Sequence, residues 1–554
     1  MKKSCTQCSA QFEVTEDEKE FFKGFTPEIP DPELCPDCRS QQRAIFRNER
    51  TLYKRTCDLC NRAIVSIYHT SVPFPVFCPE CFFSSKWDPC EIGQDFDETI
   101  PFFEQLAGLY QRAPRLSVMN KSCENSEYGN YVFANKNCYL LSGSHYNEDC
   151  LYGVASTRNK DCIDFTRILD CELCYQCILS RGCHSCTGVR HCTDCHNSYF
   201  SRDLNGCRNC IFCANLRHKE YHIFNKAVSP DEYKQFIATL RFDTHTGYAA
   251  AEETFTKKVQ NVFPVRALYQ VQCESSEGDD LQSCKGLRRS FSCEESEDCS
   301  YGFQLTAAFN CIDCDYIGYD RTEWCCQCIG CTGLFHSMSC CACWHGSDLY
   351  YCQYCHSTKN CIGCIAMQQK SFCILNKQYT ENEYKRLFEL ISSELRSKGK
   401  WGKFFPQDLT TFGYNETVAQ DWFSLTKDQA TDAGYRWQAG MEDIGKVEKV
   451  IPAEKLPESI DDIPDDILNW GLQCPLTGKL FRLTKRELNF YRIRRLPVPH
   501  IYPEERHLIR MRLRSRRHLW VRNCLQCGKA MQTTYAPERP EKVYCEECYL
   551  KEVY

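Results

Sequence analysis

Cysteine spacing is the feature that most constrains the fold of this chain. From residue 138 to residue 207 the cysteines stand at multiples of three residues, often nine or twelve apart. The series includes Cys138, Cys150, Cys162, Cys171, Cys174, Cys183, Cys186, Cys195 and Cys207. Such spacing, with short β-rich pieces between, favours a solenoid in which each coil stacks on the last. Cysteine is small and apolar, so it can line a narrow interior without a metal.

The middle of the chain is a tandem duplication with small insertions and deletions. One Cys-rich array runs over residues 123–213 and a second over 273–373. "CLYG" at Cys150 matches "CSYG" at Cys299, and "CID" at Cys162 matches "CID" at Cys311. Each array is followed by a related tail, and we expect an amphipathic helix to begin after Ser229 in one tail and after Thr380 in the other. These helices would cap the two arrays.

The composition decides how the cysteines are interpreted. The chain has 46 cysteines in 554 residues and a net charge of −6. Its start, "MKKSCTQC", has no apolar run of the kind a signal peptide needs, and no stretch approaches the roughly 18 apolar residues of a membrane span. We therefore predict a cytoplasmic protein without a membrane partner. In a reducing compartment, paired cysteines indicate metal ligands or reactive thiols rather than disulfides.

The N-terminus carries four CxxC pairs. Zinc prefers four soft ligands in a tetrahedron, and two such pairs supply them. Sequential pairing gives two sites, while cross-braced pairing stays open. The ligands of the two sequential sites are Cys5, Cys8, Cys35 and Cys38, then Cys57, Cys60, Cys78 and Cys81.

The C-terminus repeats this pattern. Residues 39–82 align with 506–549 without gaps, and 15 of the 44 positions are identical. The third predicted zinc site consists of Cys524, Cys527, Cys545 and Cys548. Further upstream, Cys474 stands opposite Cys5, but Thr477, Tyr502 and Glu505 replace the other three ligands. We therefore expect residues 467–510 to fold like the first ribbon without a metal, and the chain to bind at least three zinc ions.

The segment from Cys5 to Arg39 resembles a zinc-ribbon family of small bacterial proteins. The match covers "CTQCSAQFEVTEDEKEFFKGF" and "CPDCR". The resemblance implies a β-rich ribbon with a short helix at "TEDEKEFF", where Thr15 and Glu18 form a capping box. It implies zinc binding without catalysis. The whole chain resembles a group of Cys-rich bacterial proteins with zinc modules at both ends, which brings no known activity.

Cysteines of the arrays are further candidate metal ligands. CxxC repeats on neighbouring coils would form four-thiolate sites, and a ladder of interior thiols is the alternative. The candidates are Cys171, Cys174, Cys183, Cys186, Cys192, Cys195, Cys207, Cys210, Cys311, Cys314, Cys325, Cys328, Cys340, Cys343, Cys352, Cys355, Cys361 and Cys364. The fourth cysteine and proline of an iron–sulfur pattern are missing. Two CxxCH strings match the haem-attachment string, but covalent haem needs export, so we predict neither cofactor.

Two stripes of arginine accompany the ribbons. Steps of four, four and three place each stripe on one helical face. The stripes are Arg39, Arg43, Arg47 and Arg50, then Arg506, Arg510, Arg514 and Arg517. Guanidinium groups suit phosphate, so exposed stripes would favour contact with RNA or DNA. The alternative is pairing with acids inside the protein, for which residues 442–466 offer nine.

These features predict a multidomain, mainly β protein with short helices, in which zinc ribbons flank two tandem solenoid-like arrays. The predicted segments are ribbons at 1–48 and 49–98, a helical connector at 99–122, array 1 with its capping helix at 123–245, a linker at 246–272, array 2 with its capping helix at 273–398, an aromatic then acidic linker at 399–466, the metal-free ribbon copy at 467–510 and the last ribbon at 511–554. The hypothesis is a non-enzymatic zinc-binding scaffold that contacts RNA, DNA or a protein. The alternatives are a zinc or thiol reservoir and an enzyme with a site between the arrays.

Overall fold

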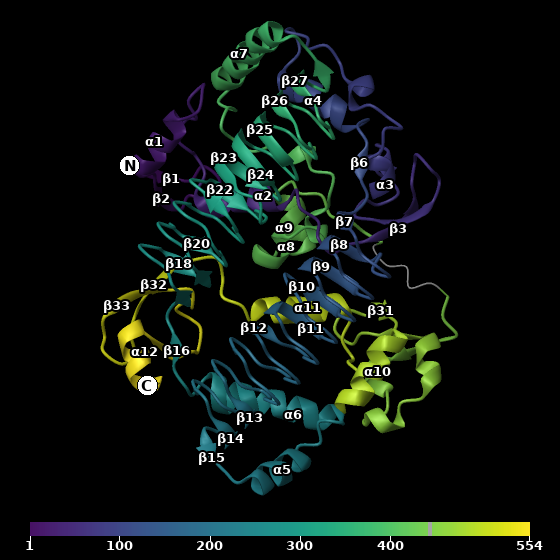
Figure 1. Ribbon diagram of the computed structural model, residues 1–554, viewed down its shortest axis with the longest axis vertical. Coiled ribbons are helices and arrows are strands. Elements are labelled where there is room, and N and C mark those ends of the chain that lie inside the picture. Colours follow the sequence, from purple (N-terminus) through teal and green to yellow (C-terminus); the bar gives the residue numbers. More distant parts are fainter. Residues whose placement is uncertain (441–445, 554) are drawn as a thin grey trace. The chain divides into compact units, whose positions relative to one another are not determined.

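The computed structural model describes residues 1–440 and 446–553 (Figure 1). Parts of the predicted linker 399–466 and the last residue therefore lie outside the described residues. The chain divides into two compact units. The first unit comprises Met1–Val118, Leu268–Ala439 and Arg517–Leu519, and the second comprises Met119–Ala267, Gly440–Arg516 and Trp520–Tyr554. Each unit thus combines one array with a ribbon pair, and the N-terminal ribbons belong to the unit of the second array.

The array of the second unit is a parallel stack of short strands. Its strands are β7 (Asn120–Lys121), β8 (Gly129–Phe133), β9 (Tyr139–His145), β10 (Leu151–Val154), β11 (Ile163–Leu169), β12 (Ile178–Arg181) and β13 (Arg208–Ile211). Each residue pairs with the one twelve positions further on, as in Leu151 with Ile163 and Thr166 with Ile178. Isolated bridges continue this register between β12 and β13. One rung of the stack is therefore twelve residues long.

A three-residue repeat builds each rung. Along most of the array one residue in every three adopts a left-handed backbone conformation, and it stands directly before the inward residue. Asn137, Asp149 and Asp161 have φ values of 54°, 55° and 50° and precede Cys138, Cys150 and Cys162. A left-handed residue other than glycine costs roughly 1–2 kcal/mol. Turns at this spacing explain why cysteines recur at multiples of three.

Cysteine suits the inward positions because a twelve-residue rung leaves little interior space. The thiols are buried, and each donates to nearby backbone carbonyls. Cys162 Sγ lies 3.2 Å from the carbonyl oxygen of Lys160 and 3.5 Å from that of Cys171, and Cys174 Sγ lies 3.4 Å from that of Cys183. Cys150, Cys162, Cys174 and Cys186 follow one another at intervals of twelve, so the interior contains a ladder of stacked thiols.

Asparagine fills the same kind of position in the first rungs. Asn135 Oδ1 accepts from the backbone N–H of Asn147 at 2.8 Å, and Asn147 Oδ1 accepts from that of Asn159 at 3.0 Å. Asn159 Oδ1 then accepts from the N–H of Cys171 at 2.9 Å, where the column changes to cysteine. The polar column is satisfied by its own neighbours, as burial requires.

The array of the first unit follows the same plan with altered rungs. Its strands are β17 (Gln270–Val271), β18 (Gly278–Asp279), β19 (Leu281–Gln282), β20 (Ser290–Phe291), β21 (Ala308–Phe309), β22 (Ile312–Asp315), β23 (Thr322–Ile329), β24 (Thr332–Met338), β25 (Trp344–Tyr350) and β26 (Lys359–Ile362). Most registers are again twelve. Gln270 pairs with Leu281 and Ile312 with Cys326, so single rungs of eleven and fourteen residues contain the predicted insertions and deletions.

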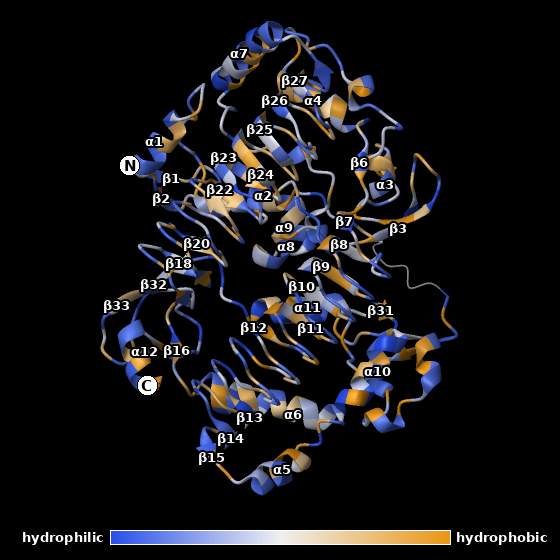
Figure 2. Ribbon diagram, viewed as in Figure 1, coloured by the Kyte–Doolittle hydropathy of each residue, from blue (hydrophilic) through white to orange (hydrophobic). Residues whose placement is uncertain are grey.

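Each array ends in a hairpin and a capped helix. The hairpins are β14 (Glu220–Ile223) with β15 (Lys226–Ala227), and β27 (Ser371–Ile374) with β28 (Lys377–Gln378). Helices α5 (Pro230–Thr239) and α7 (Glu381–Ser397) follow, and capping boxes at Ser229 and Thr380 confirm both predicted starts (Figure 1). Hydrophilic and hydrophobic residues alternate along α7 (Figure 2). Its buried Tyr384 contacts the ring of Phe372 in β27.

The ribbons consist of hairpins followed by short helices. In the first unit these are β1 (Lys2–Ser4), β2 (Gln11–Glu13), α1 (Glu16–Lys23), α2 (Pro36–Ala44), β3 (Tyr53–Thr56), β4 (Ala63–Ser66), β5 (Val76–Phe77), α3 (Pro79–Phe82), and then α4 (Phe102–Tyr110) and β6 (Arg115–Leu116). In the second unit they are β30 (Trp470–Gln473), β31 (Leu480–Phe481), α10 (Lys485–Arg494), α11 (Pro503–Arg512), β32 (Trp520–Asn523), β33 (Ala530–Thr533), β34 (Val543–Tyr544) and α12 (Glu546–Val553). The elements from β1 to α3 in the first unit follow the same order as those from β30 to α12 in the second.

The linkers are more ordered than predicted. Helix α6 (His245–Phe255) begins the segment expected as a plain linker at 246–272, and β16 (Val265–Arg266) ends it. In the aromatic segment, Thr426 caps α9 (Lys427–Asp432), after α8 (Ala419–Trp422). Strand β29 (Lys449–Pro452) pairs with β30. In the acidic segment, the apolar residues Leu456, Ile460 and Ile463 are buried between the acids.

The thiol ladder gives a first testable prediction. Burial raises the pKa of the Cys186 thiol well above its usual range, as expected for a protonated donor. Replacing Cys186 with alanine should cost about 1–2 kcal/mol of unfolding free energy through the cavity, and leucine should cost about 1–3 kcal/mol through overpacking. Neither change should alter the metal content, measured by elemental analysis. A lost equivalent of zinc in the alanine variant would instead favour metal binding in the array.

Candidate metal centres

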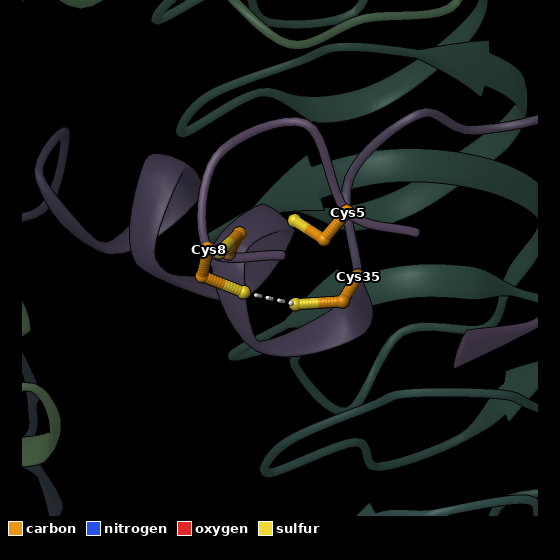
Figure 3. A group of neighbouring side chains, drawn as sticks. Cys5, Cys8 and Cys35 are labelled. Carbon is orange, nitrogen blue, oxygen red and sulfur yellow. Dashed lines mark hydrogen bonds between the residues drawn. The ribbon is translucent and has the colours of Figure 1, made fainter. Parts of the chain in front are cut away.

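Three groups of four cysteines stand close enough to share a metal ion. In each group all four sulfur atoms lie within 4.8 Å of one another. In the first group Cys8 Sγ lies 3.6 Å from Cys35 Sγ, and the two side chains point toward one another (Figure 3). The corresponding distances are 4.0 Å between Cys60 and Cys78 and 3.8 Å between Cys527 and Cys545. A Zn–S bond of about 2.3 Å in a tetrahedron places two sulfurs about 3.8 Å apart, so the groups fit zinc.

The pairing within these groups is sequential. The structure gathers Cys5, Cys8, Cys35 and Cys38; Cys57, Cys60, Cys78 and Cys81; and Cys524, Cys527, Cys545 and Cys548. The predicted ligands therefore come together as the simpler of the two pairings. In every group one CxxC follows a hairpin strand and the other stands at the start of a helix, so the rigid elements fix the positions of the sulfurs.

The first CxxC of each ribbon is a tight turn. The N–H of Cys5 donates to the carbonyl of Ala10, and the N–H of Ser9 donates back to the carbonyl of Cys5, both at 2.9 Å. Ser9 has a φ of 62°. The corresponding residue is Asn61 in the second ribbon and Gly528 in the last, and these are residue types that tolerate a left-handed backbone.

Backbone donors favour the thiolate form at these turns. Burial acts to raise the pKa of Cys57, but N–H groups of the chain, including that of Cys78 at 3.3 Å, outweigh it and lower the pKa to about 7. The same balance lowers the pKa of Cys524 to about 6. A hydrogen bond from Cys38 lowers the pKa of Cys35 to about 5. Thiolates are the metal-binding form, so each group contains at least one sulfur disposed to bind a cation.

The fourth ribbon keeps its fold after losing its ligands. At Cys474 the turn has the same two backbone hydrogen bonds, of 2.8 Å to Lys479 and 2.9 Å from Gly478. Thr484 and Glu487 form the capping box of α10, as Thr15 and Glu18 do in α1. Among the described residues no four-thiol group forms here. Apolar packing replaces the metal, because Leu472, Leu483, Leu488, Tyr491 and Leu496 belong to the buried core.

The candidate ligands of the arrays do not gather in the same way. Within the described part of the chain, none of the 18 array cysteines joins a group of three or more metal-ligating atoms within 4.8 Å. Their sulfurs point into the stack and donate to carbonyls, as Cys352 does to Tyr350 at 3.4 Å and Cys361 at 3.5 Å. The interior-thiol alternative therefore describes them better than four-thiolate sites between coils.

The prediction that the arginine stripes are exposed is wrong. Six of the eight side chains are buried, and Arg43 has no exposed surface. The buried residues are Arg39, Arg43, Arg47, Arg506, Arg510 and Arg514, while Arg50 and Arg517 are half-buried. Helices α2 and α11 turn these faces toward the arrays rather than toward solvent. The physical reason is a set of carboxylates on the arrays.

Two of the three carboxylates, Asp313 and Asp164, belong to the repeated "CID" motif, and Asp315 follows it in the first unit. In the first unit Arg39 Nε lies 2.7 Å from Asp313 and Arg43 Nε lies 2.7 Å from Asp315. Arg43 also reaches Asp313 at 3.2 Å. In the second unit Arg506 and Arg510 contact Asp164 at 2.8 and 2.7 Å. The acidic partners were expected at residues 442–466, but they lie in and beside this repeated motif.

The tyrosine of the other repeated motif completes the docking. Arg39 lies over the ring of Tyr301 at 5.1 Å, and Arg506 lies over Tyr152 at 4.7 Å. Tyr152 donates to the capping-box Glu487 at 2.9 Å. "CLYG" and "CID" in one array, and "CSYG" and "CID" in the other, are thus two copies of one receptor for a ribbon helix. From the sequence these motifs indicated only a duplication, and their role in docking was not predicted.

Arg517 departs from its counterpart Arg50. Its guanidinium carbon lies 3.1 Å from the ring centroid of Phe303 and 3.9 Å from that of Trp422, and it donates to Tyr316 at 3.2 Å. Burial lowers the pKa of Arg517 from its usual value. The short segment Arg517–Leu519 is thereby fixed to the first unit by one enclosed cation.

A histidine beside the first ribbon gives a pH-dependent prediction. His336 stacks on Phe25 with ring centroids 4.7 Å apart, and its Nδ1 lies 2.8 Å from Asp348. The hydrogen bond to Asp348 raises the pKa of His336 above its usual 6.5. The protonated form therefore stabilises the fold below about pH 6.5, and this contribution should disappear as pH rises through the raised pKa. Unfolding curves of wild type and His336→Gln should converge at high pH. A gap between them that widens with pH would contradict this.

Comparison with known proteins adds no family. No protein-family model matches the chain, and a search of curated proteins finds no similar sequence. The likeness to zinc ribbons therefore rests on the four-thiol groups at both ends. Among the described residues, no helix has the length and apolar character that crossing a membrane demands.

Proposed function

We propose that the protein is a non-enzymatic, zinc-stabilised scaffold. In each unit a solenoid of twelve-residue coils forms the central element, and a pair of ribbons packs against its side. Each of the three metal-binding ribbons is held by one zinc ion, and the fourth ribbon contains none. The observation that carries the proposal is the duplicated docking of Arg39 on Asp313 and of Arg506 on Asp164.

The docking supports a structural role because it buries the arginines that could otherwise contact a partner. Buried ion pairs are costly unless both partners are held, so they fix one arrangement of ribbon and array. The array thiols are buried and donate to carbonyls, which favours a packed interior over a store of exchangeable metal. The alternative of a zinc or thiol reservoir would need many accessible sulfurs.

Metal content separates the scaffold from the reservoir. Protein purified without added metal should contain about three equivalents of zinc, one for each four-thiol group. Added zinc should not raise the tightly bound number. Ten or more equivalents, removable without unfolding, would favour the reservoir and count against the scaffold.

Binding to RNA or DNA, if it occurs, would need cations other than the six buried arginines. We expect the variant in which Arg506, Arg510, Arg514 and Arg517 are all replaced by glutamine to lose stability rather than affinity. Wild type should show little binding to single- or double-stranded probes in a filter assay from low to physiological salt. Binding that falls steeply with salt, and is lost in this variant, would restore the phosphate-contact hypothesis.

A further inference from the structure

Two complete copies of one ribbon differ in how well they enclose their metal site. In the copy at residues 57–81, Cys57, Cys78 and Cys81 are buried and only Cys60 is exposed. In the copy at residues 524–548 only Cys524 is buried. Of the other three, Cys527 is exposed, and Cys545 and Cys548 are half-buried. The sulfurs are similarly spaced, so the difference lies in the surrounding protein.

The first difference is a carboxylate that joins the two halves of the ribbon. Asp58 lies within the first CxxC, and its Oδ2 accepts from the N–H of Val76 at 2.7 Å and from Arg55 at 2.9 Å. The corresponding residue in the last ribbon is Leu525, whose side chain is 60% exposed. There the halves are joined by backbone N–H groups, from Leu525 to the carbonyl of Val543 at 3.2 Å and from Cys545 to the sulfur of Cys524 at 3.3 Å, without a carboxylate.

The second difference is an ion pair across the site. Arg62 follows the first CxxC and pairs with Glu80, which lies between the two cysteines of the second. In the last ribbon Lys529 replaces Arg62, while Glu547 replaces Glu80 and pairs with Lys551 inside α12 at 2.7 Å. In the described residues of the C-terminal copy, no carboxylate takes the place of Asp58, and Glu547 makes its close ion pair within α12 rather than across the site.

From these differences we propose that the C-terminal four-cysteine site is a metal-exchange site, whereas the other two sites hold zinc permanently. An incoming thiol or chelating ligand bonds to the zinc as the exposed Cys527 thiolate leaves and takes up a proton; the zinc keeps its charge. The inference rests on the proposed zinc-stabilised scaffold and gives one of its sites a regulatory role.

Occupancy of this site controls how the last ribbon is attached. Strand β34 directly precedes Cys545 and pairs in parallel with β16, with Val543 opposite Val265. Tyr549 in α12 donates to Asn215 of the array at 3.1 Å. Metal loss at Cys545 would release both contacts, because four thiolates fix the position of β34 and of α12. The site is therefore a metal-gated latch on residues 520–553.

Zinc release from the full-length protein tests the proposal. Zinc-loaded protein is mixed with the chelator 4-(2-pyridylazo)resorcinol, and the coloured complex is followed over time. We expect one equivalent to be released at least tenfold faster than the other two. The double variant Cys524→Ser/Cys527→Ser should bind two equivalents and lack the fast phase. A fast phase that survives in this variant would overturn the assignment.

Exchanging the side-chain links between the two ribbons provides the matched control. Leu525→Asp/Lys529→Arg should slow the fast phase, and Asp58→Leu/Arg62→Lys should convert one slow equivalent into a fast one. Hydrogen exchange at Val265 and Tyr544 should rise as the first equivalent leaves. Three equivalents released in a single phase would refute the exchange site and leave the scaffold standing, whereas protein without bound zinc would refute both.

Discussion

Replacing Cys57 with alanine is expected to unfold the second ribbon and remove one equivalent of zinc. The apparent binding free energy of a structural zinc in a small module is roughly 10–16 kcal/mol, and it is folding free energy when no site exists in the unfolded chain. Elemental analysis and thermal unfolding of the variant check the expectation.

Cys474 offers the matched control for this experiment. It occupies the turn of the fourth ribbon that Cys5 occupies in the first, is equally buried, and has no metal partners among the described residues. Cys474→Ala should leave the zinc content unchanged and cost only about 1–2 kcal/mol through the lost sulfur. If both variants keep their metal, the ligand assignment at Cys57 is wrong.

Replacing Asp313 with alanine should detach the first ribbon pair from its array. Arg39 would then be a buried cation without its main partner, and Arg43 would keep only Asp315. Breaking a buried ion pair typically costs about 3–5 kcal/mol. The same loss is expected for Asp164→Ala in the second unit, where Arg506 and Arg510 share one carboxylate. Urea unfolding and hydrogen exchange in α2 and α11 measure the two effects separately.

An exposed ion pair in the second unit provides the comparison. Arg158 and Asp170 lie 2.6 Å apart on side chains that are about half exposed, 56% and 44%. Such pairs contribute roughly 0–1 kcal/mol, so Asp170→Ala should scarcely shift the urea midpoint. An Asp313→Ala variant no less stable than Asp170→Ala would show that the docked arginines are not held by charge.

The four-cysteine groups could be predicted from the sequence because four ligands at fixed spacing have few geometric solutions. Cys57, Cys60, Cys78 and Cys81 meet in one group as spacing alone suggested. The cysteine period of three also predicted stacked coils, and the parallel register of twelve residues agrees with that reading. Capping boxes at Ser229 and Thr380 located two helix starts because they are local signals.

Long-range pairing could not be predicted in the same way. Arg43 and Asp315 are 272 residues apart, and no local rule connects them. Only the first two arginines of each stripe lie on the predicted helical face, because α2 ends at Ala44 and α11 at Arg512. A stripe of cations also looks alike whether it faces solvent or a buried acid. The repeated "CID" was the sequence signal for this pairing. Each copy of the motif accompanies a copy of the arginine helix, as expected if both copies make the same contact.

The division of the chain between the two units affects its synthesis. Arg39 emerges from the ribosome 274 residues before its partner Asp313. At roughly 5–20 residues per second, the interval is roughly 15–55 s, during which the first ribbons exist without the array they dock on. The last segment of the first unit to be synthesised is Arg517–Leu519. A ribosome that stops before residue 313 would therefore leave a nascent chain in which the arginines of α2 have no carboxylate to dock on.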